Sequence, residues 1–221
     1  MPNVTYGGGT ISLGDTVLEK GISFVKWRNL WVAGEVICLN AGWNDLFKHT
    51  LITGWPVRID GTAYVCRSLR VGEESGEPNE WDSILDELEE DDTLWHWKEH
   101  FFWGQETPKG QVSTRAIRGR FSAHNWSLSN ATTRSVSVGF RPVLGSLPPE
   151  PLISDSLIGT ILKLYGTGKG FSGRLAEFSD YDLVIETATQ QLIPADCKWA
   201  SRDGDRIIVD RSAITWIQEV G

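Results

Sequence analysis

The sequence predicts an α+β domain followed by a small all-β barrel. Three of the four residues from Pro148 to Pro151 are proline, which favours an extended linker because proline fixes φ and removes backbone donors. Composition changes at the same place, since nine of the eleven tryptophans and all four histidines precede it. We therefore expect a first domain over 1–145, a Pro-rich linker over 146–154 and a barrel domain over 155–221.

The first domain mixes strand and helix patterns. An Asp-Gly pair at 60–61 lies between β-prone runs within 55–67, which is typical of a two-residue hairpin. Over 78–88, Asn79 is a natural N-cap and the apolar residues that follow recur at helical spacing, so we expect a short amphipathic helix. The remaining expected elements are a helix from Thr93 to Trp103 and strands over 112–122 and 135–144.

The residues after Asp155 carry short β-type runs separated by turn signals. No long helical pattern interrupts them, which indicates a small all-β barrel of about five strands. The expected strands are 160–165, 171–178, 183–187, 206–209 and 213–220.

The composition is that of a folded protein. Of 221 residues, 40% are hydrophobic and 23% are charged, which excludes a disordered chain. No run approaches the ~20 apolar residues of a membrane helix, and the first residues lack the basic and apolar parts of a signal peptide. Three scattered cysteines (Cys38, Cys66 and Cys197) indicate neither a disulfide framework nor a structural zinc site. We expect no membrane partner, no Sec-secreted form and a reducing compartment.

Charge is unevenly distributed along the first domain. Eleven acids and no Lys or Arg lie between Glu73 and Asp92, whereas 107–149 has six Lys or Arg and no acids. We expect the two segments to pair in the fold; the alternative is an anion-binding face on the basic segment. The net charge of -8 disfavours general nucleic-acid binding through long-range repulsion.

One motif raises the possibility of a metal. His96-Trp-Lys-Glu-His100 matches the HxxEH zinc-peptidase pattern, in which two histidines one helical turn apart bind zinc. A third ligand must come from elsewhere, and the next acids along the chain are Glu106 and then Glu150. Aromatic neighbours also suit a packed helix. We therefore expect no metal and no cofactor, and keep a metal-dependent hydrolase as the third alternative.

Two elements of the first domain carry a resemblance to a known fold family. They are Arg118-Gly-Arg-Phe-Ser-Ala-His-Asn-Trp126 and Ser137-Val-Gly-Phe-Arg-Pro-Val-Leu144. Together they resemble the C-terminal signature of C-type-lectin-fold proteins of the formylglycine-generating-enzyme type, including the variable proteins of diversity-generating retroelements. Pro78-Asn-Glu-Trp-Asp82 is similar to a segment of phage and prophage proteins of this kind. The enzyme's catalytic cysteine pair has no counterpart here, so its oxidation chemistry is not implied.

The resemblance implies that the polar stretch between these two elements forms a ligand-binding surface. A tryptophan face beside amide, hydroxyl and imidazole groups can stack on a ligand and hydrogen-bond its rim. The alternative is that Trp126 belongs to the core and the rest is a solvated loop. The implied ligand-binding residues are Arg120, Ser122, His124, Asn125, Trp126, Ser127, Ser129 and Asn130.

The second domain resembles Sm-like proteins of the Hfq type. Gly170–Ile185 is similar to the first Sm motif and Ile208–Ile217 to the second, with 190–205 as an insertion. Ser212 stands where the family has a histidine, so the resemblance favours ring-like assembly through edge strands over RNA binding. The loop residues that would form an alternative, RNA-facing site are Asp180, Tyr181, Asp210 and Arg211.

These observations predict a non-enzymatic phage- or prophage-type binding protein. Its lectin-like surface would bind a protein or a glycan, and its barrel would join copies into a homo-oligomer whose multivalency strengthens weak contacts. The alternative is a nucleic-acid or nucleotide binder that acts through the barrel, for example against a host defence. The expected location is the cytoplasm of a bacterial host or the virion.

Overall fold

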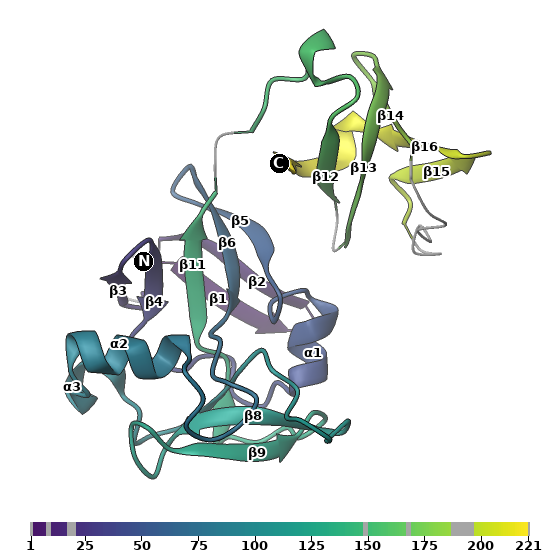
Figure 1. Cartoon of the computed structure of the whole chain (residues 1–221). Helices are drawn as coiled ribbons and strands as arrows, with labels where there is room; N and C mark the ends of the chain where they lie inside the picture. The colour runs from purple at the N-terminus through teal and green to yellow at the C-terminus, as the bar shows by residue number, and fades with distance from the viewer. Residues whose placement is uncertain are drawn as a thin grey trace. The chain divides into compact units, whose positions relative to one another are not determined.

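The computed structural model describes residues 2–7, 10–16, 21–147, 150–166, 169–186 and 197–220. The chain forms two compact units, Met1–Leu147 (unit 1) and Pro148–Gly221 (unit 2) (Figure 1). Two prolines of the expected linker, at 148 and 149, lie outside the described residues. Among these residues, strands dominate both units, and the few helices are short and confined to unit 1 apart from two single 3-10 turns.

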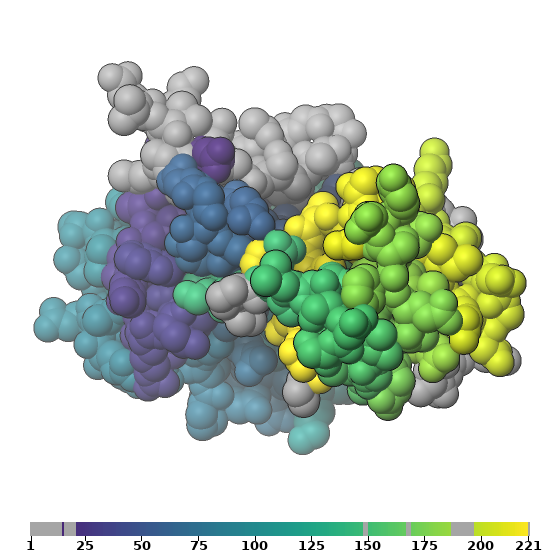
Figure 2. Space-filling model, turned by 90° about the horizontal axis from the view of Figure 1, so that it is seen from above, coloured from purple at the N-terminus to yellow at the C-terminus, as the bar shows by residue number. Residues whose placement is uncertain are grey.

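Unit 1 contains a five-stranded antiparallel sheet. Its strand order is β3-β4-β11-β6-β5, so the last strand of the unit lies in the middle of the sheet. Figure 2 shows the two flanks of this sheet, with β3 and β4 in purple and the β5–β6 hairpin in blue. The strands are β3 (Phe24–Trp27), β4 (Leu30–Ala33), β5 (Trp55–Ile59), β6 (Thr62–Ser68) and β11 (Pro142–Ser146), and a separate hairpin pairs β1 (Pro2–Gly7) with β2 (Thr10–Thr16).

The hairpin between β5 and β6 forms at the Asp-Gly pair. Asp60 and Gly61 both have positive φ, at 48° and 77°, and Ile59 pairs with Thr62 across the turn. This is the type I′ geometry that Asp-Gly favours, because glycine adopts positive φ without steric cost and Asp tolerates it. The sequence therefore determines this turn locally.

A second sheet of four strands carries the expected surface. Its order is β10-β7-β8-β9, with β9 at one edge. β7 and β8 are antiparallel, as are β8 and β9, whereas β10 runs parallel to β7. The strands are β7 (Phe101–Trp103), β8 (Thr114–Gly119), β9 (Trp126–Asn130) and β10 (Val138–Gly139).

Helices α1 (Trp43–Lys48) and α2 (Glu80–Leu88) both begin with side-chain capping. At α2, Asn79 Oδ1 accepts the N–H of Asp82 at 3.0 Å, as the N-cap pattern predicts. At α1, Gly42 is the N-cap, and its N–H donates to Asp45 Oδ2 at 2.9 Å. The apolar face of α2 is buried through Trp81, Ile84 and Leu85.

The prediction of one helix from Thr93 to Trp103 is wrong. Helix α3 (Asp92–Trp95) ends at His96, whose φ of 44° is left-handed. Phe101–Trp103 instead forms β7, which pairs with β8, and all three side chains are buried in the core of unit 1. Long-range pairing thus overrides the local helical pattern, and His96 and His100 do not lie one turn apart on a helix.

The core of unit 1 has two clusters, one around Trp43, Phe140 and Trp103 and one around Trp81. Arg141 is fully buried near the second cluster, with its guanidinium 5.0 Å from the rings of Trp81 and Phe102. It donates hydrogen bonds to the carbonyl oxygens of residues 33, 34 and 95. Burial lowers the pKa of Arg141 to about 9. Arg141 therefore stabilises the interior and is not available to a ligand.

Unit 2 is a six-stranded antiparallel sheet of order β15-β16-β14-β13-β12-β17 around its own apolar core. The five expected strand regions are all present. Strand β15 was not expected; it lies within 190–205, the stretch interpreted as an insertion, and pairs with β16. Residues 190–196 of that stretch lie outside the described residues. The elements are η1 (Asp155–Leu157), β12 (Ile161–Gly166), β13 (Lys169–Phe178), β14 (Asp182–Glu186), β15 (Ala200–Asp203), β16 (Arg206–Asp210), η2 (Arg211–Ala213) and β17 (Ile214–Glu219).

Membrane insertion through a helix finds no support in the part of the chain that the structure describes. No helix there has the length and apolar character required to cross a bilayer.

Candidate binding surface

The loop over 119–125 and strand β9 contain the residues that the resemblance assigns to a ligand. The loop begins with two consecutive positive φ values, 91° at Gly119 and 69° at Arg120. A Cβ at position 119 would lie 3.1 Å from His100 O and 3.2 Å from Trp97 O, so glycine permits this close approach. The N–H of Arg120 then donates to Trp97 O at 2.5 Å. Backbone contacts therefore fix the first half of the loop.

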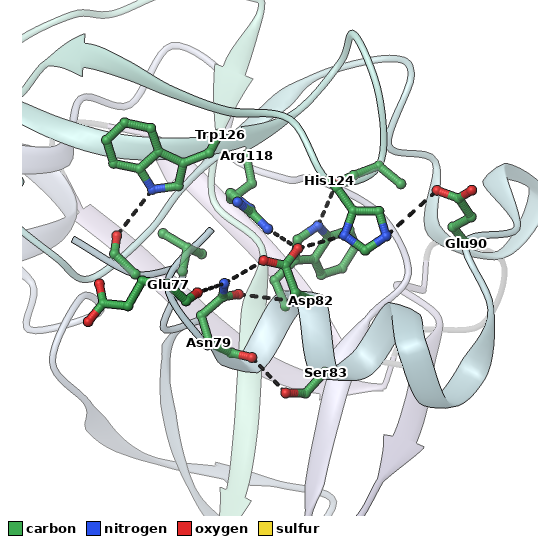
Figure 3. Close-up of polar contacts among 12 residues, drawn as sticks. Glu77, Asn79, Asp82, Ser83, Glu90, Arg118, His124 and Trp126 are labelled. Carbon is green, nitrogen blue, oxygen red and sulfur yellow. Dashed lines mark hydrogen bonds and ion pairs between the residues drawn. The ribbon is translucent and has the colours of Figure 1, made fainter. Parts of the chain in front are cut away.

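Side chains of α2 and β8 fix the second half of the loop (Figure 3). Trp81 Nε1 donates to Ala123 O at 2.8 Å, and His124 Nδ1 lies 2.8 Å from Asp82 Oδ1. Arg118 on β8 is 1% exposed and donates to the same Asp82 oxygen. One carboxylate thus joins a strand, a helix and the loop.

The electrostatics around Asp82 suit an ionised carboxylate. Partial burial alone would raise the pKa of Asp82, but hydrogen bonds from Asn79 and His124 and the positive charge of Arg118 lower it below its usual range. On the far side of the imidazole, His124 Nε2 lies 3.9 Å from Glu90 Oε2. The imidazole therefore lies between two acids of α2 and its following turn.

The acidic and basic segments pair only in part. Arg118 pairs with Asp82, and Lys109 Nζ lies 3.7 Å from Glu74 Oε1, which are the contacts that the charge pattern predicts. The other arginines of the basic segment have different neighbours. Arg115 stacks on Trp43, Arg134 pairs with Asp45, Arg141 binds carbonyl oxygens, and Arg120 lies over two phenyl rings.

Trp126 is half-buried and contributes to the support of the loops. Its ring packs against the cluster around Trp81, and its Nε1 donates to Gly72 O at 3.2 Å. One polar atom and part of the ring face are thus engaged by unit 1 itself. Trp126 is therefore partly a core residue, and its indole N–H contacts the 72–78 loop at Gly72 (Figure 3).

The aromatic side chain that projects from this surface is Phe121, which the sequence analysis did not select. It is 76% exposed and contacts Phe101 edge to face, with ring centroids 5.5 Å apart. The guanidinium of Arg120 lies 5.9 Å from the centre of the Phe121 ring and 5.7 Å from that of Phe101. Its position between Arg120 and Ser122 was the only signal in the sequence.

The remaining residues of the expected surface divide into exposed groups and turn-forming groups. Arg120, Ser122 and His124 are exposed. Asn125 Nδ2 donates to Gly119 O at 3.0 Å and closes the loop, and Asn130 Oδ1 accepts the N–H of Thr132 at 3.0 Å. Ser127 and Ser129 lie half-buried on β9. The structure therefore brings the residues together on one loop and its adjoining strand.

A cavity of about 440 Å³ lies beside the N-terminal turn of α2. Trp27, Arg70, Gly72 and Glu106 are among its lining residues, and Gly72 also accepts the hydrogen bond from Trp126. Burial raises the pKa of Glu106, although the N–H of Val71 donates to its carboxylate. The sequence analysis assigned no role to these residues.

The two loops that carry the residues of the alternative site lie side by side in unit 2. The N–H of Arg211 donates to Tyr181 O at 2.8 Å, and the Arg211 guanidinium donates to Ser179 O. Asp182 lies directly opposite Asp210 in the β14–β16 pair, and Tyr181 is 80% exposed. Tyr181 and Arg211 therefore lie next to each other, and the carboxylates of Asp182 and Asp210 lie on the adjoining strands.

The zinc motif does not form the arrangement that its pattern requires. His96 Nδ1 lies 3.8 Å from Glu99 Oε1, and His100 is separated from the end of α3 by a turn. Among the described residues, no three His, Cys, Asp or Glu side chains converge to hold a metal ion.

Searches for related proteins gave no match. No family model, no curated protein and no solved structure matches the chain.

Proposed function

We propose that the chain is a non-enzymatic binding protein whose unit 1 recognises a protein or glycan through the loop over 119–125 and strand β9. The observation that carries this proposal is the exposed pair of Arg120 and Phe121. A phenyl ring that is 76% exposed, beside a cation with no acidic partner among the described residues, suits contact with a ligand.

The support under this pair strengthens the proposal. Asp82 and Trp81 hold the loop from α2, so binding would order few additional groups. A rigid surface loses less conformational entropy on binding, which is the general advantage of preorganisation. The assigned residues thus divide between groups that hold the loop and groups that face solvent.

We further propose that unit 2 joins copies through its two sheet edges, β15 and β17. Among the described strands, each of these two has a neighbour on one side only. The C-type-lectin-like and Sm-like families, and a phage or prophage origin, remain parts of this proposal, as does a location in the bacterial cytoplasm or the virion. Linked copies would raise the avidity of a weak surface on unit 1.

The test uses the full chain, applied to a printed glycan array and, separately, purified with a tag from the cells that produce it. Phe121→Ala should lose the bound glycan or retained protein, because central aromatic anchors commonly contribute ~2 kcal/mol or more. Val112→Ala is the matched control, since Val112 is 90% exposed in the same unit. Retention of the same ligand by Phe121→Ala would contradict the proposal.

A further inference from the structure

The open edges of the sheets differ in their protection against pairing with another strand. Proteins commonly guard such edges with charges, proline, short length or a covering group. Within unit 1, β5 contains Pro56 and β3 contains Lys26. Both outer strands of the five-stranded sheet therefore have an identifiable obstacle.

Strand β9 has none of these obstacles. Its sequence, Trp-Ser-Leu-Ser-Asn, contains no charged residue and no proline. Its register with β8 is regular over all five residues, without a bulge. Within the part of the chain that the structure describes, β8 is its only strand neighbour, and in Figure 1 β9 forms the outer limit of its sheet. This edge is regular and uncharged.

The hydrogen bonds at the two ends of β9 determine which backbone groups point outward. Gly119 N donates to Asn125 O at 3.2 Å before the strand. Ala131 N donates to Ser113 O at 2.9 Å after it. Alternate residues of an antiparallel pair bond to the neighbouring strand. The residues bonded to β8 are therefore Asn125, Ser127, Ser129 and Ala131.

Trp126 and Leu128 consequently direct their N–H and C=O groups toward the open edge. No residue in the described part of the chain bonds to these four groups. Asn130 closes this row, because its carbonyl oxygen accepts the N–H of Thr133 at 2.9 Å. Residues two apart on a strand are ~6.6 Å apart, which is the repeat at which an extended partner presents its own groups.

We propose that β9 binds an extended segment of a partner protein, which adds a fifth strand to the four-stranded sheet. This inference rests on the proposed function, because it names the ligand class of the same surface. Charge specifies the partner further: 107–149 contains no acid, and Arg120 is exposed in the loop that leads into β9. A segment with acidic ends complements this face, whereas a second copy would bring two acid-free basic segments together.

The test measures binding of a fluorescent peptide that alternates valine and threonine between acidic ends. Leu128→Pro removes one outward N–H and leaves the hydrogen bonds to β8 intact, and proline is tolerated on edge strands in this orientation. Leu128→Ala is the matched control, since it changes the side chain and keeps the N–H. We expect the Kd to rise about tenfold for Leu128→Pro and to change little for Leu128→Ala.

A second probe keeps the test independent of how well Leu128→Pro folds. The same peptide, N-methylated at alternate amides, cannot pair as a strand and should bind the unaltered chain about tenfold more weakly. Equal binding of the two peptides, or no binding at about 1 mM peptide, would overturn the proposal. So would a dimer in sedimentation velocity that Leu128→Pro abolishes, because a second copy would then occupy β9.

The outcome separates this inference from the function on which it rests. If the ligand retained from cells is lost in Phe121→Ala but kept in Leu128→Pro, the surface binds a ligand and strand addition is wrong. If that ligand is kept in both variants, the proposed function of the surface fails as well.

Discussion

Unit 1 and unit 2 each expose an aromatic side chain next to an arginine, and the two pairs have different surroundings. Phe121 is 76% exposed and Tyr181 is 80% exposed. The guanidinium of Arg120 contacts only phenyl rings among the described residues, whereas that of Arg211 donates to Ser179 O. The positive charge is therefore available at the first pair and engaged at the second.

The supports of the two loops also differ. The loop over 119–125 is joined to α2 through Trp81 and Asp82. The loop over 179–182 is held by Ser179 Oγ, which accepts the N–H groups of residues 181 and 182. Acids directly opposite one another on β14 and β16 add negative charge beside the second loop. Residue types alone therefore do not identify a binding surface, because the charge and support around them decide what can bind.

The largest expected effect comes from removal of the carboxylate under the first loop. Asp82→Ala should lower the free energy of unfolding by about 3 kcal/mol, because it leaves the buried Arg118 guanidinium without its counter-charge. Urea unfolding followed by tryptophan fluorescence measures this change. Asp180→Ala, in the loop of unit 2, should change stability by no more than about 0.5 kcal/mol. Equal effects of the two substitutions would show that the loops do not differ in support.

A smaller effect is expected from a single indole N–H. Trp81→Phe should destabilise the protein by about 1.5 kcal/mol more than Trp199→Phe in unit 2. Trp81 Nε1 donates to the carbonyl oxygen of the buried Ala123, whereas Trp199 Nε1 has no hydrogen-bond partner among the described residues. Both substitutions replace a buried indole by the smaller phenyl ring, so the loss of packing is similar. Thermal unfolding of the two variants makes the comparison, and a larger effect for Trp199→Phe would contradict it.

The smallest expected effect is the pH dependence of the contribution that Asp82 makes to the free energy of unfolding. The folded-state pKa of Asp82 lies below its unfolded value of about 3.9, so its stabilisation is complete above that pH and is lost as pH falls through the folded-state pKa. The difference in unfolding free energy between the unaltered chain and Asp82→Asn should therefore shrink in acid. Urea titrations between about pH 6 and pH 3 measure it. A difference that grows toward low pH would mean that the folded-state pKa is raised.

Local signals in the sequence were enough to predict those elements whose structure depends on residues nearby in the chain. The Asp-Gly hairpin follows from two backbone angles, and α2 follows from the Asn79 cap and its apolar spacing. Strand β7 could not be predicted in this way, because Phe101–Trp103 is extended only through pairing with β8 and β10, which lie later in the chain. Strand β15 likewise forms by pairing with β16.

The candidate surface was predictable as a segment and not as a set of contacts. The residues from Arg120 to Asn130 do share a loop and strand. Which aromatic faces solvent could not be read from the sequence, because Trp126 is engaged by Gly72, a residue more than fifty positions earlier. Phe121 remains 76% exposed, with its ring against that of Phe101 and the Arg120 guanidinium.

The most direct test of the account is native mass spectrometry of the full chain purified from the cells that produce it. One spectrum reports the number of subunits and the mass of any retained ligand. We predict an oligomer in which Phe121→Ala loses the ligand and keeps the subunit number, while Tyr181→Ala keeps both. A ligand lost only in Tyr181→Ala would contradict the account and assign binding to unit 2.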